Sequence, residues 1–185
     1  YGPKARAAEL SPTYMAEVRR TATELDSFTS IVDDPTGLSE PFSAALLRAE
    51  SAAWRSSLAT GRELLAHTAA ELSDKMAAVR VLSEGTITFS GDTGRVPVTI
   101  ANDLDRSVTV GLALQGNPSL RLSSEPLSAI RIDAGKMASV DIDARVVGGD
   151  PLQVNVQLLN AEMTAYGKPA VITVTSTAYS RAAAW

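Results

Sequence analysis

Apolar residues recur at helical spacing through the first part of the chain, up to about residue 82. One stripe follows the i, i+3, i+4 spacing of an amphipathic helix: Tyr14, Val18, Thr21, Leu25, Phe28 and Val32. Ser11 supplies an oxygen for the free N–H groups at its start, and Pro12 fits the first helical position. The run DDPTG at residues 33–37 ends the pattern. The stripe therefore predicts one helix with defined ends.

A second helical run begins at residues 39–41 (SEP) and contains no further proline up to about residue 82. Apolar residues recur along it every seven positions: Leu58, Leu65, Leu72 and Val79. The pattern predicts one long helix or two joined helices. Gly61 is its weak interior point, and whether the run is kinked at Thr60-Gly61 stays open.

The period of the apolar residues changes from near 3.6 to 2 after Leu82. Turn residues then follow about every eight to twelve positions, which is typical of a β-sandwich. The predicted strands are residues 86–90, 95–101, 107–114, 119–124, 128–133, 138–146, 152–159 and 170–177, and residues 166–169 (YGKP) are a predicted turn. Alternation directs one set of side chains into the core: Val96, Val98, Ile100, Val108, Val110, Leu112, Leu114, Val140, Ile142, Val154, Val156, Leu158, Ile172 and Val174. Thr99, Thr109 and Gln115 point outward or lie at edges.

These patterns predict an α+β chain in two parts. Residues 1–82 form an N-terminal α-helical hairpin or small bundle with a long second helix, and residues 83–180 form an immunoglobulin-like antiparallel β-sandwich. Residues 181–185 are a tail. No helix-length segment interrupts the strands, which disfavours a parallel βαβ sheet. The pattern does not specify how the helices and the sandwich pack.

Composition excludes several classes of function. The chain has 185 residues, a hydrophobic content of 45% and a net charge of −4, so it can bury a core but offers no field for binding phosphate backbones. Nucleic acid is therefore not an expected partner. The absence of cysteine removes disulfides, thiolate nucleophiles and cysteine metal sites. No apolar run approaches the roughly 20 residues that span a bilayer, and the first residues lack the apolar core of a signal peptide.

The loop NDLD at residues 102–105 lies between two predicted strands and could be a metal site or a turn. Asn and Asp side chains bond to nearby backbone N–H groups, so this loop can connect a hairpin without a ligand. Calcium requires about six oxygen ligands, and Asn102, Asp103 and Asp105 lack the Gly and distal Glu of an EF-hand. The turn is the favoured interpretation, and no metal or cofactor site is predicted.

Residues that could perform catalysis occur singly. His67 is the sole histidine, and no G-x-S-x-G elbow accompanies it. Asp141 and Asp143 alternate on one strand, which is typical of its solvated face, although glycosidases also use paired carboxylates. No glycine-rich phosphate loop is present. Trp54 is expected at a contact between helices. The prediction is that the chain is not an enzyme.

Three stretches, taken together, resemble the DUF6049 family of actinobacterial membrane-associated proteins. They are SAAWR at 51–55, VPVTIANDL at 96–104 and TSTAY at 175–179, and the resemblance covers nearly the whole chain. It implies a longer exported precursor, with extracytoplasmic sequence before Tyr1 and a membrane-spanning helix soon after Trp185. It also implies an envelope role beside a MviN-type flippase for lipid-linked precursors. The family supplies no catalytic residues to carry over.

Two functions are expected from this combination. The first is a non-catalytic extracytoplasmic module that spaces or docks a membrane-anchored envelope protein, with an envelope or membrane protein as partner. Its exposed strand edges and helical face would be the interaction surfaces. The alternative is an accessory domain that binds a glycan or a lipid-linked sugar. Its candidate residues are Asn102, Asp105 and Asn117, expected together at one end of the sandwich.

Overall fold

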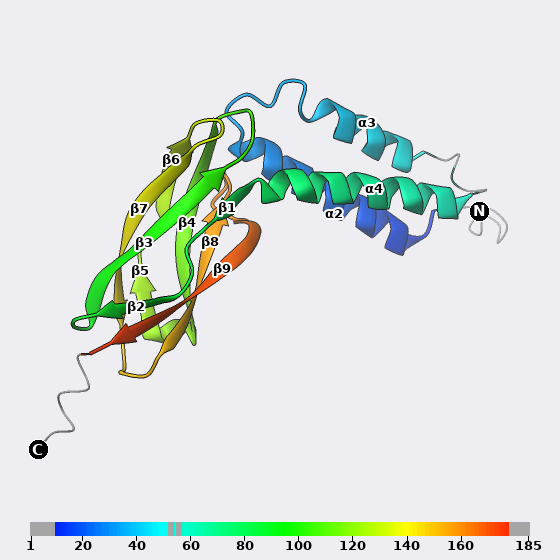
Figure 1. Ribbon diagram of the computed structural model, residues 1–185. Helices are drawn as coiled ribbons and strands as arrows, with labels where there is room; N and C mark the ends of the chain where they lie inside the picture. The colour runs from blue at the N-terminus through cyan, green and yellow to red at the C-terminus, as the bar shows by residue number, and fades with distance from the viewer. Residues whose placement is uncertain (1–9, 52–53, 55–56, 178–185) are drawn as a thin grey trace, which may run out of the picture. The chain divides into compact units, whose positions relative to one another are not determined.

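The computed structural model describes residues 10–51, 54 and 57–177 (Figure 1). The chain divides into two compact units, Tyr1–Thr29 with Asp34–Met76, and Ser30–Asp33 with Ala77–Trp185. The helical unit thus ends before the predicted boundary at residue 82, and a short segment from the first helix belongs to the second unit. The predicted tail at residues 181–185 lies outside the described residues.

Helix α2, Pro12–Ile31, begins where the sequence predicts. The backbone N–H of Tyr14 donates to Ser11 Oγ at 3.2 Å, which satisfies one of the free donors of the first turn. The predicted stripe is the buried face of this helix, since Tyr14, Val18 and Phe28 are fully buried. The N-cap and the apolar periodicity are therefore confirmed.

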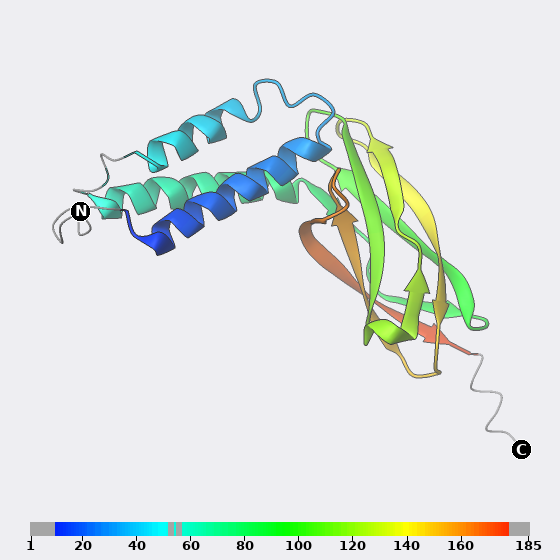
Figure 2. The same ribbon diagram turned by 180° about the vertical axis from the view of Figure 1, so that it is seen from behind.

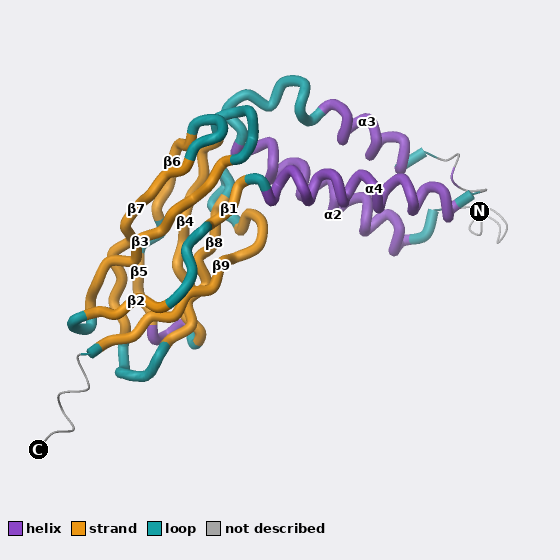
Figure 3. The backbone as a smooth tube through the Cα atoms, viewed as in Figure 1, coloured by secondary structure: helices purple, strands orange, loops and turns teal. Residues whose placement is uncertain are grey.

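The second helical run is two helices, α3 (Glu40–Ala49) and α4 (Leu58–Ala77), so the expected long second helix is not continuous. The described residues therefore contain three helices in this unit (Figure 3). The break precedes Ser57, whose Oγ bonds to Thr60 Oγ1 at 2.8 Å and whose carbonyl accepts the Gly61 N–H. The bond from the Gly61 N–H to the Ser57 carbonyl has the i to i−4 spacing of an α-helix, so Ser57 lies at the start of α4.

Gly61 is a point of close approach rather than a kink. A Cβ there would lie 3.0 Å from Trp54 Cγ and 3.1 Å from Tyr14 Oη, so a larger residue would displace both rings. Trp54 Nε1 also donates to Arg48 O at 2.5 Å, and Tyr14 Oη donates to Ala49 O at 2.8 Å. The tryptophan therefore lies at a contact between helices, as the sequence predicts.

The second unit contains two sheets (Figures 1 and 2). The four-stranded sheet has the order β1 (Val79–Val81), β3 (Thr93–Asn102), β7 (Met137–Val146), β5 (Leu122–Ser124). The five-stranded sheet has the order β2 (Thr86–Phe89), β9 (Ala165–Ser176), β8 (Leu152–Leu159), β4 (Val108–Asn117), β6 (Leu127–Ile132). The two sheets form a β-sandwich.

The sandwich is not wholly antiparallel as predicted, because β2 pairs with β9 in parallel. Every other neighbouring pair is antiparallel. Alternation along a strand reports which face is buried but not the direction of the neighbouring strand. The parallel pair joins the second and the last of the described strands, a long-range contact that local pattern cannot predict.

The core lies between the two sheets and follows the predicted alternation. The predicted inward side chains are buried, except that Val140 is half-buried. Thr99 and Thr109 are half-buried and Gln115 is exposed, as expected for outward positions. The assignment of faces is therefore confirmed.

Three segments differ from the predicted elements. Val79 continues the seven-residue spacing of the helical run by coincidence, but β1 begins there and Val79 pairs with Asn102. Within the predicted strand at 119–124, the 3-10 turn η2 (Ser119–Arg121) precedes the short β5 and is the purple segment among the strands in Figure 3. The predicted turn at 166–169 lies inside β9 instead.

The segment around Gly167 is a bulge in β9. Gly167 has a φ of 63°, a left-handed conformation that glycine adopts without strain. The buried side chain of Gln157 compensates for the interrupted ladder, since its Nε2 donates to Tyr166 O at 2.8 Å and to Leu158 O at 3.0 Å. The sequence YGKP signals a special backbone conformation, and a bulge satisfies that signal as well as a turn does.

Candidate functional site

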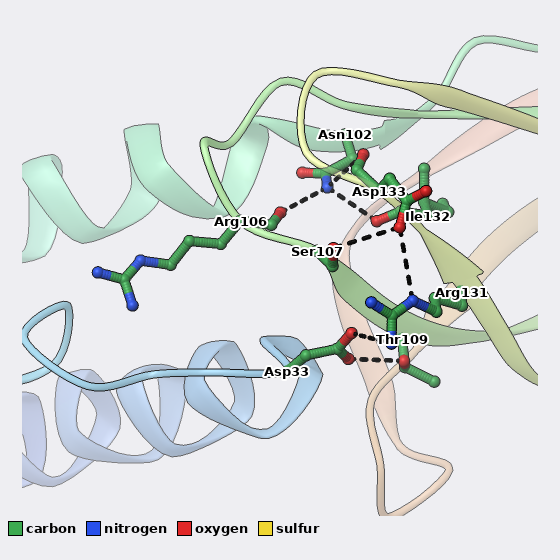
Figure 4. Close-up of polar contacts among 8 residues, drawn as sticks. All are labelled: Asp33, Asn102, Arg106, Ser107, Thr109, Arg131, Ile132 and Asp133. Carbon is green, nitrogen blue, oxygen red and sulfur yellow. Dashed lines mark hydrogen bonds and ion pairs between the residues drawn. The ribbon is translucent and has the colours of Figure 1, made fainter.

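The loop between β3 and β4, residues 103–107, is held by the side chain of Asn102 (Figure 4). Asn102 is fully buried, and its Nδ2 donates to Arg106 O at 2.8 Å and to Ile132 O and Asp133 O at 3.1 Å each. Its Oδ1 accepts the Leu104 N–H at 3.1 Å. Both ends of the amide are therefore occupied by backbone groups, and the predicted structural turn is confirmed.

A second group of polar contacts forms around Asp33 in the same unit (Figure 4). One carboxylate oxygen accepts from Thr109 Oγ1 at 2.8 Å, and the other lies 3.0 Å from Arg131 Nη1. The backbone N–H of Asp33 donates to Ser107 O at 3.0 Å, and Val32 forms an isolated bridge with Val108. Residues 32 and 33 thus extend the five-stranded sheet beside the start of β4.

Asp133 continues this group on the other side of Arg131. Its Oδ1 lies 3.5 Å from Arg131 Nε and 3.4 Å from Ser107 Oγ. Asp33, Arg131 and Asp133 are not among the candidate site residues that the sequence predicts. Asp33 ends a helical pattern and lies 76 positions from Thr109, so no local signal in one sequence could relate them.

The three interaction candidates are not brought together. Asn102 is buried and committed to the loop, so it presents no polar group to a ligand. The Asp105 side chain is 89% exposed in the adjacent loop. Asn117 is exposed at the opposite end of β4, because that strand runs from Val108 to Asn117. The expectation of one shared end of the sandwich is therefore wrong.

An open depression lies beside Asn117. Its volume is about 600 Å³, and its lining includes Gln115, Asn117, Ser119 and Asn155. These side chains offer amide and hydroxyl groups, which both donate and accept hydrogen bonds. A second open depression, of about 450 Å³, lies along β3, β5 and β7 and includes Arg95, Asp143 and Arg145.

The remaining candidates for chemistry are exposed and separate. The side chain of His67 on α4 is 72% exposed, and its Nδ1 lies 3.6 Å from Glu71 Oε2. Asp141 and Asp143 lie on the solvated side of β7, and Asp143 Oδ1 is 3.5 Å from Arg95 Nε. Within residues 10–51, 54 and 57–177, no three His, Asp or Glu side chains gather in an arrangement that could hold a metal ion.

Two tyrosines are shifted in their titration by burial. Tyr166 on β9 is 1% exposed, and burial raises the pKa of its phenol above the ordinary value of 10.0. Burial also raises the pKa of Tyr14 on α2; the nearby Glu17 raises it further, while Arg62 lowers it. Both phenols therefore stay neutral at physiological pH and act as packing and hydrogen-bonding groups.

The sequence profile of the family described as "Family of unknown function (DUF6049)" matches residues 2–180. The chain belongs to the DUF6049 family. The matched range includes both the helical and the sandwich unit of this DUF6049 chain. No curated protein gives a significant match.

Several solved structures resemble about half of this chain at low similarity. WR4, a Caenorhabditis elegans MSP family member, is 14% identical with a TM-score of 0.36, over 54% of this chain and 97% of that one. Native α2-macroglobulin of Escherichia coli is 20% identical with a TM-score of 0.39, over 54% and 6% of the chains. The secreted serine protease VesC of Vibrio cholerae is 8% identical with a TM-score of 0.41, over 56% and 24%. Scores this low support no inference about function.

In the part of the chain that the structure describes, no helix combines the length and apolarity required to cross a bilayer.

Proposed function

We propose that this DUF6049 chain is a non-catalytic, extracytoplasmic interaction module of a membrane-anchored cell-envelope protein from an actinobacterium. Its partner would be an envelope or membrane protein, with a MviN-type lipid-precursor flippase as the first candidate. Segments outside this chain would provide the membrane anchor.

The observation that supports the proposal is that polar side chains at the end of the sandwich with the β3–β4 loop form hydrogen bonds within the fold. The amide of Asn102 bonds to four backbone groups, and Asp33 bonds to Thr109, Arg131 and the backbone carbonyl of Ser107. Groups held in this way stabilise a rigid scaffold, which supports a structural or docking role.

Strand β6 is the favoured docking element. Among the described strands it is one of the two edge strands of the five-stranded sheet and pairs with β4 alone, so its other edge can accept an added strand. Ala129 has a φ of 56° and interrupts the regular ladder within β6. Such irregularity protects an edge from indiscriminate pairing, so a partner strand would have to match the remaining regular part.

The test is site-specific photo-crosslinking in the full-length protein within its own membrane. A photo-reactive residue at exposed Ser128 on β6 is compared with one at exposed Asp141 on β7. We expect a flippase or a cell-wall enzyme to crosslink at position 128 and not at 141. No protein crosslinked at 128, or equal capture at both positions, would reject β6 as the docking element.

An accessory glycan-binding function is the second candidate. The observation that favours it is the open depression beside Asn117, whose polar lining is uncharged at Gln115, Ser119 and Asn155. Titration of the chain with neutral oligosaccharides tests this candidate separately from protein docking.

A further inference from the structure

The outward positions of the five-stranded sheet carry a regular set of uncharged polar side chains at the Asn117 end of β4. Strand register places Thr86, Thr173, Gln153 and Asn117 in one row across β2, β9, β8 and β4. The next row contains Asn155 of β8 and Gln115 of β4. We call these residues the amide face: Thr86, Gln115, Asn117, Gln153, Asn155 and Thr173.

The amide face points to solvent because the alternate residues of the same strands are buried. Val154 and Val174 are fully buried, whereas Gln153 is exposed and Thr173 is half-exposed. Neighbouring strands lie about 4.8 Å apart, so the four-residue row spans roughly 14 Å. A surface of this length can contact more than one unit of a linear polymer.

The amide face is also concave at one point. The depression of about 600 Å³ includes Gln115, Asn117 and Asn155, which belong to the amide face, together with Ser119 of η2. Side chains from β4, β8 and η2 therefore converge on the same volume. A flat solvated sheet face would not provide such a recess.

The chemistry of the amide face selects for a neutral, hydroxyl-rich ligand. Amide and hydroxyl groups donate and accept hydrogen bonds, as sugar hydroxyls do. No residue of the amide face is charged, so an ionic polymer would lose hydration without gaining an opposite charge. The adjacent Val171 is 53% exposed and supplies a small apolar contact for a sugar ring.

We propose that the amide face binds a neutral glycan chain, laid across β9, β8 and β4 with a sugar unit in the depression beside Asn117. This inference rests on the second candidate function and moves its site from the β3–β4 loop to the sheet face. It is independent of docking through β6.

The test is a nuclear magnetic resonance titration of the ¹⁵N-labelled chain with maltohexaose, cellohexaose and mannohexaose. We expect at least one hexaose to shift the side-chain amide signals of Gln115, Gln153 and Asn155 saturably, and polygalacturonate to leave them unchanged. Each hydrogen bond is worth about 1 kcal/mol, so Gln115→Ala and Asn155→Ala should each weaken binding about five- to tenfold. Ser139→Ala on exposed β7 is the matched control and should bind as the unaltered chain does.

The possible outcomes distinguish a wrong location of the binding site from an absence of glycan binding. Saturable shifts confined to residues 102–107 would contradict binding at the amide face but would still support glycan binding by this chain. No saturable shift with any hexaose at about 20 mM, well above a Kd of about 1 mM, would overturn both. Binding that is unchanged in Gln115→Ala and Asn155→Ala would also overturn the amide face.

Discussion

The two outward faces of the sandwich differ, although the inward faces of the same sheets are alike. Inward, both sheets present buried aliphatic side chains, such as Ile100 on β3 and Leu112 on β4. Outward, β3 and β7 carry the ion pair Arg95–Asp143, whereas the amide face of the other sheet has no charge. Burial constrains only alternate positions of a strand, so the outward positions are free to differ. Burial in the core therefore does not account for the difference between the outward faces.

The largest expected effects come from the inward positions, where the two sheets should behave alike. Ile100→Ala and Leu112→Ala each remove a fully buried side chain and should lower the free energy of unfolding by about 2–5 kcal/mol. Chemical denaturation of both variants measures this, with outward Thr99→Ala as the control. A cost below about 1 kcal/mol for either core variant would contradict a core shared by both sheets.

The next largest loss in the free energy of unfolding is expected from the loop that joins the two sheets. Asn102→Ala leaves the carbonyls of Ile132 and Asp133 and the buried Leu104 N–H without this partner and should cost about 2–3 kcal/mol. Exposed Asn117→Ala is the matched control and should change the free energy of unfolding by less than about 0.5 kcal/mol. Equal costs for the two asparagines would show that the amide of Asn102 does not hold the loop.

The inward alternation explains how much of the fold was predictable. Helical spacing and capping located α2, and period-2 alternation located the core positions of both sheets. The break before α4 was not resolved, because it depends on contacts of Trp54 and Ser57 that apolar spacing does not encode. The parallel pairing of β2 with β9 was missed for a similar reason, since strand direction is set by long-range packing.

The candidate site was less predictable than the fold. The loop at 102–105 was correctly interpreted as a turn, because Asn and Asp have local hydrogen-bonding preferences. Asp33 was missed because its partners Thr109 and Arg131 are distant in sequence. The rows of the amide face are likewise invisible in one dimension, since only the register of β2, β9, β8 and β4 brings them together.

The free energy of unfolding should fall at alkaline pH because of Tyr166, which lies on the five-stranded sheet. Burial raises the pKa of its phenol in the folded chain above 10.0, so the unfolded chain ionises first. The contribution of the buried Tyr166 phenol to the free energy of unfolding is fully present below pH 10.0 and is lost as the pH rises further. Tyr166→Phe should reduce the alkaline decline in the free energy of unfolding, measured by urea denaturation from about pH 8 to pH 11. An unchanged decline would mean that other groups cause it.

The ion pairs of the two sheets should differ by a smaller amount in their contributions to the free energy of unfolding. The side chain of Asp33 is only 28% exposed and also accepts from Thr109, so Arg131→Ala should cost about 0.5–1 kcal/mol. Arg95 and Asp143 are 74% and 90% exposed, so Arg95→Ala should cost less than about 0.5 kcal/mol. Double-mutant cycles with Asp33→Asn and Asp143→Asn measure the two couplings. A larger coupling for the exposed pair would reverse the expected order.

The smallest effect on stability is expected where the two outward faces are made more alike. Gln153→Glu adds a charge to the amide face, and Asp141→Asn removes one from β7; each should change the free energy of unfolding by no more than about 0.5 kcal/mol, because both positions are exposed. Their effects on glycan titration should nevertheless differ. Gln153→Glu should weaken the binding of a neutral hexaose, since the side chain loses its donor and the new charge must be desolvated, while Asp141→Asn should leave binding unchanged. A loss of stability above about 1 kcal/mol in Gln153→Glu would show instead that the uncharged row across β2, β9, β8 and β4 serves the fold.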